Sequence, residues 1–275
     1  MAINITGYQQ KSMEARGLRF GYLEWGDSSA PAMVLLHGLT SHGHSWDVFV
    51  GALEGSYHVF ALDQRGHGDT QWPTPPSYTT EDFIEDVASL TDQWGLRSFV
   101  LMGLSMGAHN SLAFAAKYPD KVEKLISIDI GPQLRLRGED GQQQQVPEPQ
   151  TEFDSIKAMI TQAREGNSIA SDEMLRHRVE HNARQLPGGK WTFKYTQDTK
   201  LYWQPEDLWE KIKTIRCPTL VVRGGESSVL AADVAEKMTA AIPNARLVTI
   251  AGSGHPVPLD RPQELESAVR QFLDS

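Results

Sequence analysis

The sequence of 275 residues contains a single cysteine, Cys217, so no disulfide bond can form within the chain. Basic residues are also few compared with acidic ones: 26 lysines and arginines stand against 35 aspartates and glutamates, a net charge of −9. A surface of this sign repels polyanions, so we expect neither nucleic acid nor an anionic membrane as a partner. Long apolar runs are missing too, and no stretch approaches the roughly 18 apolar residues that a membrane span needs.

The N-terminus, MAINITGYQQKSME, has no basic segment followed by an apolar one, which argues against a signal peptide. We therefore expect a cytoplasmic protein. Hydrophobic residues make up 40% of the chain, enough for one large globular domain or two small ones. No sequence feature specifies an oligomeric state.

Short apolar segments alternate with longer amphipathic segments along most of the chain. We predict strands at 33–36, 58–62, 99–102, 125–130, 219–222 and 246–250. We predict helices at 81–95, 106–119, 230–243 and 262–273. This alternation indicates an α/β fold in which helices cover both faces of a mostly parallel sheet. Residues 13–26 have the pattern of an antiparallel hairpin at the sheet edge.

The alternation stops between residues 131 and 212. This part contains a polar loop predicted to be mobile at 138–150, helical patterns at 153–166, 171–186 and 205–213, and an extended segment at 191–195. We predict a core in two parts, 1–130 and 213–275, with a helical cap inserted over 131–212. A separate small domain is the alternative, which the thin apolar face of this segment disfavours.

The pentapeptide GLSMG, residues 103–107, stands between a predicted strand and a predicted helix. A serine on such a sharp turn needs small neighbours, and Gly103 and Gly107 supply them. The turn would raise the Ser105 hydroxyl above the sheet and direct the backbone N–H of Met106 toward a reacting carbonyl. The helix N-terminus would stabilise negative charge there. Ser105 is therefore our candidate nucleophile, and an ordinary strand-to-helix turn is the alternative.

A serine nucleophile needs a base to take its proton, and nine histidines are available. His255 lies in the loop AGSGHPVPLD after the last predicted strand, at the same edge of the sheet as Ser105. It is our candidate base. We expect His37 and His67 to shape loops, and His109 either to line the pocket or to pack within its helix.

HGLT, residues 37–40, follows the first predicted parallel strand. Its glycine allows the backbone to turn the N–H of Leu39 toward Ser105, so Leu39 and Met106 are the candidate oxyanion donors. His37, His42 and His44 also raise the possibility of a metal cluster, but their spacing lacks a carboxylate partner on a helix. We expect no metal and no cofactor.

Four motifs in this order, HGLT, DQRGHGD (63–69), GLSMG and GHPVPLDRP, resemble those of the α/β-hydrolase superfamily over nearly the full chain. The resemblance implies an α/β-hydrolase fold, a helical cap and a serine hydrolase with a catalytic triad. It also implies that haloalkane dehalogenase or epoxide hydrolase chemistry is disfavoured, since both use an aspartate where this chain has Ser105.

The position of the triad acid departs from the common family pattern. Many members have an aspartate after the penultimate strand, where this chain reads RGGESSVL with Glu226 as its only carboxylate. A minority place the acid after the preceding strand, which here ends LISIDIGP and contains Asp129. The (E)-2-(acetamidomethylene)succinate hydrolases have a similar arrangement. The resemblance therefore favours Asp129 over Glu226 as the residue that orients His255.

The expected reaction is cleavage of a small carboxylic ester or lactone, as by a carboxylesterase or lactonase. The resemblance leaves open amide, enamide or C–C hydrolysis of a small carboxylated metabolite, and a receptor that keeps the triad. Candidate pocket walls are aromatic, of which we expect one or two to line the pocket: Trp46, Trp191, Tyr202, Trp203 and Trp209. Candidate anchors for a substrate carboxylate are the arginines of the cap helices: Arg164, Arg176, Arg178 and Arg184.

Overall fold

Eight strands form the central sheet of the computed structural model, which describes residues 3, 7–53, 55–134 and 151–275. Their order across the sheet is β1-β2-β4-β3-β5-β6-β9-β10. Their bounds are β1 (Gln9–Ala15), β2 (Leu18–Trp25), β3 (Ala32–Leu36), β4 (His58–Leu62), β5 (Phe99–Leu104), β6 (Val122–Ile128), β9 (Thr219–Gly224) and β10 (Ala245–Ile250). β2 is antiparallel to both β1 and β4, and all other pairs are parallel. The predicted sheet and its edge hairpin are confirmed.

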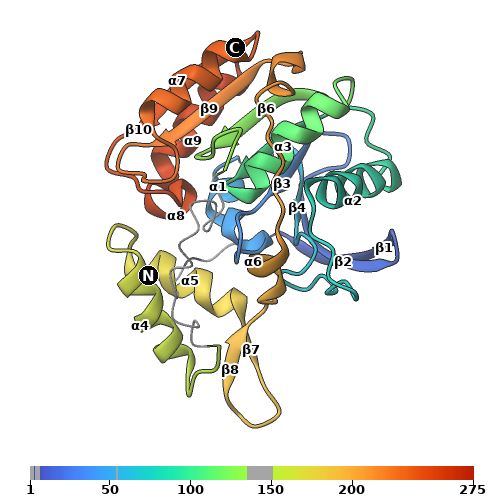
Figure 1. Cartoon of the computed structure of the whole chain (residues 1–275). Helices are drawn as coiled ribbons and strands as arrows, with labels where there is room; N and C mark the ends of the chain where they lie inside the picture. Colours follow the sequence, from blue (N-terminus) through green and yellow to red (C-terminus); the bar gives the residue numbers. More distant parts are fainter. Residues whose placement is uncertain (1–2, 4–6, 54, 135–150) are drawn as a thin grey trace.

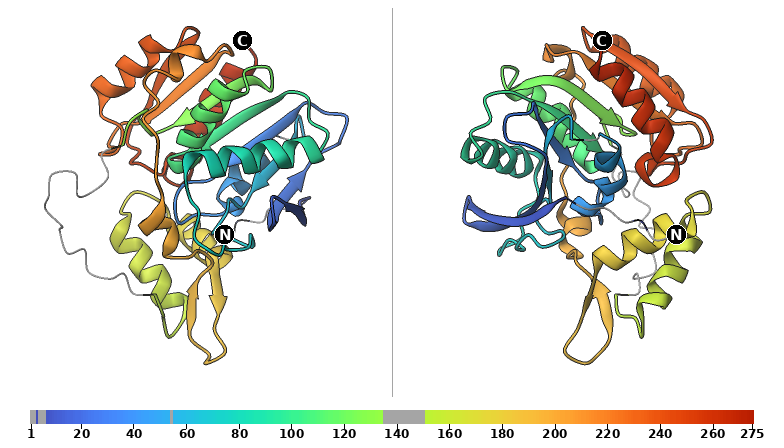
Figure 2. Two further views of the ribbon diagram at one scale, coloured as in Figure 1. Left: turned by 45° about the vertical axis from the view of Figure 1, so that its right-hand side comes forward. Right: turned by 180° about the vertical axis from the view of Figure 1, so that it is seen from behind.

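Both faces of this sheet are buried, because the central strands are apolar on both sides. In β3, Val34 and Leu36 join one core, and Met33 and Leu35 join the other. One face is covered by α2 (Thr80–Gln93), α3 (Met106–Lys117) and α7 (Ala232–Ala241), and the opposite face by α1 (Asp47–Ala52) and α9 (Pro262–Leu273) (Figures 1 and 2). This confirms the predicted layers. Among the described residues, no helix is long and apolar enough to cross a bilayer.

A smaller body lies between β6 and β9 in the chain, at one end of the sheet (Figures 1 and 2). It consists of α4 (Ile156–Gly166), α5 (Asp172–Asn182), the hairpin β7 (Ala183–Gln185) and β8 (Trp191–Phe193), and α6 (Asp198–Tyr202). Phe153, Met159 and Val179 form its own apolar cluster. The helices predicted at 153–166 and 171–186 are present, the second one shorter. The predicted loop at 138–150 lies outside the described residues, and the cap boundaries stay predictions.

The helix predicted over 205–213 is wrong. Residues 205–208 form no regular structure, 209–211 form a turn, and the segment ends in a single 3₁₀ turn, η2 (Ile212–Thr214). The N–H of Leu208 donates to the carbonyl oxygen of Pro132 at 2.9 Å, and the side chains of Leu208 and Ile212 are buried in the main core. These tertiary contacts outweigh the helical pattern of the sequence, and they attach this segment to the sheet layer.

Candidate active site

The carboxyl ends of four central strands are aligned at one edge of the sheet. Leu36 of β3 pairs with Gly103 of β5, and Ile128 of β6 pairs with both Leu104 of β5 and Val222 of β9. The loops that follow these strands therefore start side by side. This register places the segments that carry Leu39, Ser105 and Asp129 at the same edge, as ligand sites in open parallel sheets require.

Ser105 occupies a strained turn between β5 and α3. Its φ of 53° and ψ of −121° lie outside the regions that non-glycine residues commonly adopt, and its N–H donates to the carbonyl oxygen of Ile128 at 2.9 Å. A Cβ on Gly103 would lie 2.3 Å from the carbonyl oxygen of Gly107, and one on Gly107 would lie 2.2 Å from that of Leu36. The two glycines therefore permit the close packing of β5, α3 and β3 that this turn needs.

His255 and Asp129 form a hydrogen-bonded pair at the same edge. The Nδ1 of His255 lies 2.7 Å from Oδ2 of Asp129, whose side chain is fully buried. The hydroxyl of Ser227 also donates to Oδ2, and the N–H of Gly224 donates to Oδ1 at 2.9 Å. With three donors around it, the carboxylate is fixed in place and holds the imidazole with Nδ1 toward Asp129. Nε2 of His255 has no hydrogen-bond partner among the described residues.

The two carboxylates weighed from the sequence have different surroundings. Glu226 is exposed, and within the described chain its carboxylate makes no hydrogen bond to His255. Asp129 makes that bond, and its φ of 52° shows that the turn after β6 is also strained. Sequence reasoning gave no role to Ser227, although it lies in the segment RGGESSVL that ends β9 and follows it. The sequence signal that could have found its contact with Asp129 is a serine in the loop after β9 combined with an aspartate directly after β6.

Ser105 and His255 line one cavity, together with Leu39 and Leu104. No hydrogen bond joins the Ser105 hydroxyl to the imidazole in the described chain, although such bonds are often long before substrate binds. Aliphatic side chains form part of the remaining walls: Val48, Met174, Pro256, Pro258 and Leu259. The other lining residues are glycine, polar or basic: Gly38, Ser41, His44, Ser45, His177 and Arg178. The prediction that one or two of the five candidate aromatic residues line this cavity is wrong. Trp46, for example, is buried beside Phe49 in the core between the sheet and helices α1 and α9.

The two candidate oxyanion donors flank the nucleophile. A Cβ on Gly38 would lie 3.3 Å from Cβ of Ser105, so the backbone next to Leu39 approaches the serine closely. Outside helices and strands, the hydrogen bonds among the described residues include none donated by the N–H of Leu39 or of Met106. Both N–H groups therefore remain available to a ligand, as an oxyanion hole requires.

Two buried histidines shape the loop that carries Leu39, as predicted. His67 Nε2 accepts the N–H of Thr40 at 3.1 Å, and His37 Nε2 accepts the N–H of Gln64 at 3.0 Å. Burial lowers the pKa of His67 to about 4 and that of His37 well below its ordinary value. His109 packs within the core, where its Nε2 lies 2.9 Å from the carbonyl oxygen of Glu206.

These buried neutral histidines predict acid destabilisation. Each depressed histidine pKa contributes stability that is complete above about pH 6.5 and is lost as the pH falls toward the folded value. Asp63 acts in the opposite sense, since burial raises its pKa to about 6 and its ionisation opposes folding above that pH. Near pH 5, unfolding lets His37 and His67 each bind about one proton, and Asp63 releases about one. The net uptake from these three groups is at least about one proton. The free energy of unfolding should then fall by at least about 1.4 kcal/mol per pH unit as the pH decreases.

Urea denaturation at several pH values between 7 and 4.5 measures this slope. His67→Gln should make it shallower and Asp63→Asn should make it steeper, each by about 1.4 kcal/mol per pH unit. Equal slopes in the wild type and both variants would contradict the assignment of protonation states.

Helix α5 is attached to the loop that carries the oxyanion donor. His177 Nε2 lies 2.9 Å from Oδ2 of Asp47, the amide of Asn182 donates to the carbonyl oxygen of Thr40 at 2.9 Å, and His42 Nε2 lies 3.0 Å from the carbonyl oxygen of Arg178. Met174, His177 and Arg178 of this helix line the Ser105 cavity. The smaller body therefore forms one side of the candidate site.

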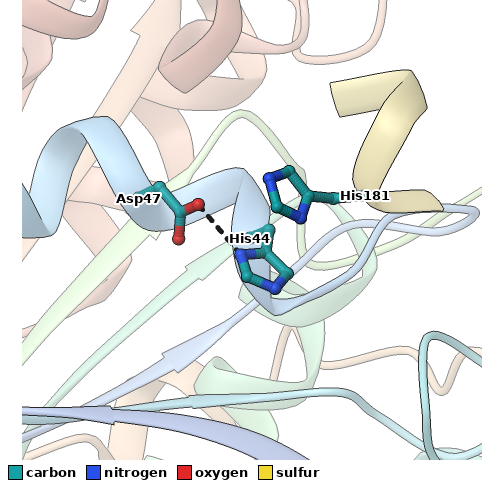
Figure 3. Close-up of side chains that lie close together, drawn as sticks. All are labelled: His44, Asp47 and His181. Atoms are coloured by element: carbon teal, nitrogen blue, oxygen red, sulfur yellow. Dashed lines mark hydrogen bonds and ion pairs between the residues drawn. The ribbon is translucent and has the colours of Figure 1, made fainter. Parts of the chain in front are cut away.

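His44, Asp47 and His181 converge at this junction (Figure 3). Their ligand atoms lie within 4.8 Å of one another, and two imidazoles with a carboxylate are donor types of zinc sites. These groups also bind each other: His44 Nδ1 lies 2.9 Å from Asp47 Oδ2, and the rings of His44 and His181 stack at 3.9 Å. The metal cluster weighed from the sequence consisted of His37, His42 and His44. Only His44 belongs to the group found here, in which Asp47 supplies a carboxylate. In this structure the cluster joins α5 to the core.

The family model for the alpha/beta hydrolase fold matches residues 31–262. An esterase of Mycobacterium tuberculosis is 30% identical over 260 residues, which cover 92% of this chain and 86% of the esterase. The 2-(acetamidomethylene)succinate hydrolase of Mesorhizobium japonicum is 27% identical over 252 residues, with 90% and 89% covered. The crystal structure of an E-2-(acetamidomethylene)succinate hydrolase superposes with a TM-score of 0.88 at 25% identity, covering 98% of this chain and 100% of that one.

Proposed function

The chain belongs to the alpha/beta hydrolase fold family, and we propose that it is a serine hydrolase that cleaves a small carboxylic ester or lactone. Similarity to named esterases supports an ester substrate. The catalytic residues in this proposal are Ser105, His255 and Asp129, with the N–H groups of Leu39 and Met106 as oxyanion donors. No metal or cofactor takes part.

Hydrolysis in this proposal proceeds through an acyl-enzyme. Ser105 Oγ attacks the carbonyl carbon while His255 Nε2 takes the hydroxyl proton, and the two N–H groups stabilise the negative oxygen. His255 then gives the proton to the leaving alcohol. A water molecule, deprotonated by the same imidazole, attacks the acyl-enzyme and releases the acid. Asp129 stabilises the charged imidazolium in both halves of the cycle.

The observation that carries the proposal is the contact between His255 Nδ1 and Asp129 Oδ2 at 2.7 Å, beside a serine held in a strained turn. Of the four non-glycine residues with positive φ in the described chain, three are Thr40, Ser105 and Asp129. Backbone strain of this kind persists where the surrounding structure enforces it, and it is frequent at active sites. These three strained residues lie close to the Ser105 cavity. This supports a catalytic role for Ser105 over a GLSMG sequence that occurs by chance.

Residues 131–212 act as a cap in this proposal, since α5 forms one side of the cavity. Substrate choice then depends on this segment more than on the triad. Amide substrates belong in the same screen, because a relative with 27% identity is named for the hydrolysis of 2-(acetamidomethylene)succinate. The cytoplasmic location stays a prediction.

A fluorophosphonate probe and a series of p-nitrophenyl esters test the proposal. We expect multiple turnovers of short acyl esters, and a probe adduct on the peptide that contains Ser105. A single turnover without further release would favour a receptor that retains the triad. Absence of both turnover and adduct in folded protein would exclude a serine hydrolase.

A further inference from the structure

Arg178 is distinguished from the other cap arginines by its position between two cavities. It lines the cavity that contains Ser105 and His255, and it also lines an adjoining cavity with Tyr195 and Lys200. The two cavities share Arg178 and Pro256 along their common border. A ligand that reaches from the serine into the adjoining space therefore passes Arg178.

The guanidinium of Arg178 has no partner among the described residues, unlike those of its neighbours. Arg164 pairs with Asp172 at 2.5 Å, Arg176 lies 3.7 Å from Glu180, and Arg184 stacks over the ring of Trp72. Burial lowers the pKa of Arg178, which means that its charge is poorly solvated. A partly buried cation without a counter-ion costs free energy, so its presence beside a nucleophile points to an anionic ligand.

Within the described residues, no carboxylate forms an ion pair with Arg178, and only Asp260 among the acidic side chains acts on it electrostatically. No aspartate or glutamate of the described chain lines either cavity. Asp260 is near enough to influence Arg178, but its carboxylate accepts the amide of Asn167 at 2.7 Å and the N–H of Gly254 at 2.8 Å. Lys200 adds a second cation, with Nζ 5.2 Å from the centre of the Tyr195 ring and no ion pair within the described residues. The cavities are cationic in a chain of net charge −9.

We propose that Arg178, assisted by Lys200, binds a free carboxylate on the substrate, so that the preferred ester or lactone is a monoanion derived from a small dicarboxylic acid. This inference rests on the proposed function and specifies its substrate class. The fork of the guanidinium can hold both carboxylate oxygens, which fixes the orientation of the substrate as well as its affinity. The ester carbonyl then lies over Ser105 while the carboxylate lies toward the adjoining cavity.

Matched pairs of esters test this inference. Monoethyl succinate, glutarate and adipate are compared with ethyl butyrate, valerate and hexanoate, in which a methyl group replaces the carboxylate. We expect kcat/KM to be at least about tenfold higher for the anionic member of at least one pair, as a charged hydrogen bond allows. Arg178→Met should lower that anionic-to-neutral ratio by at least about tenfold, and Arg178→Lys should lower it less.

Arg176→Met is the matched control, because Arg176 lies on the same helix with an exposed side chain and should leave the ratio unchanged. A general loss of fold would lower both rates and not their ratio. Turnover of both esters with a ratio that does not respond to Arg178→Met would overturn the inference and leave the hydrolase proposal intact. If no ester is turned over, calorimetry of the Ser105→Ala protein with the monoanionic esters decides: binding that requires Arg178 supports the inference, and absence of binding refutes it.

Discussion

Replacing Ser105 with alanine is expected to lower kcat for a p-nitrophenyl ester by about 10⁶-fold, with little change in stability. The size of the effect follows from the interdependence of nucleophile and base, since losing either one of such a pair costs about as much as losing the whole triad. A residual rate of about 10³-fold over the uncatalysed reaction should remain, because the N–H groups of Leu39 and Met106 still stabilise the oxyanion. Steady-state kinetics and thermal unfolding, measured on the same preparation, give both quantities.

Ser29→Ala serves as the control for this prediction. Ser29 lies in an exposed turn, where its hydroxyl donates to Asp27, far in the fold from the candidate site. This variant should retain full activity and react with the fluorophosphonate probe, whereas the Ser105 variant should do neither. Substantial turnover by folded Ser105→Ala protein would mean that hydrolysis uses another nucleophile.

The positions of the central strand ends, and of the loops that follow them, could be predicted from the sequence. Each central strand is apolar on both faces and is followed by glycine or a polar residue, so the loops that carry Ser105 and His255 could be placed at one edge without coordinates. The alternation of strands and helices then requires parallel strands, and parallel strands align their carboxyl ends. The residues of the candidate site follow from this geometry because each lies in the segment that follows a strand, Ser105 and Asp129 directly after β5 and β6.

Contacts between segments far apart in the sequence could not be predicted in the same way. The bond from Ser227 to Asp129 depends on the register between β6 and β9, which a one-residue shift would destroy. The non-helical path of residues 205–211 depends on burial of Leu208 in the main core. Nor does any helical pattern show that the Arg178 guanidinium lacks a partner among the described residues while Arg164 pairs with Asp172. Such differences arise from packing between segments, and periodicity within one segment does not contain them.

Asp129→Asn should lower kcat by about 10⁴-fold while preserving the fold. The Asp129 carboxylate accepts from His255 Nδ1, from Ser227 and from Gly224. An asparagine offers one oxygen and one NH₂ group to these three donors, so its amide must face a donor or force the imidazole into the other tautomer. That tautomer carries its proton on Nε2 and cannot accept one from Ser105, as the loss of about 10⁴-fold in an Asp-to-Asn triad variant illustrates.

Two further variants test whether the loss of kcat is specific to the carboxylate at position 129. Glu226→Gln should leave kcat unchanged, because this side chain is exposed and makes no bond to His255 in the described chain. Ser227→Ala should lower kcat by about tenfold, since it removes one charge-assisted hydrogen bond but leaves the carboxylate in place. The opposite ranking, with Glu226→Gln severe and Asp129→Asn mild, would assign the acid to the loop after β9. The strained turn at Asp129 would then need an explanation other than catalysis.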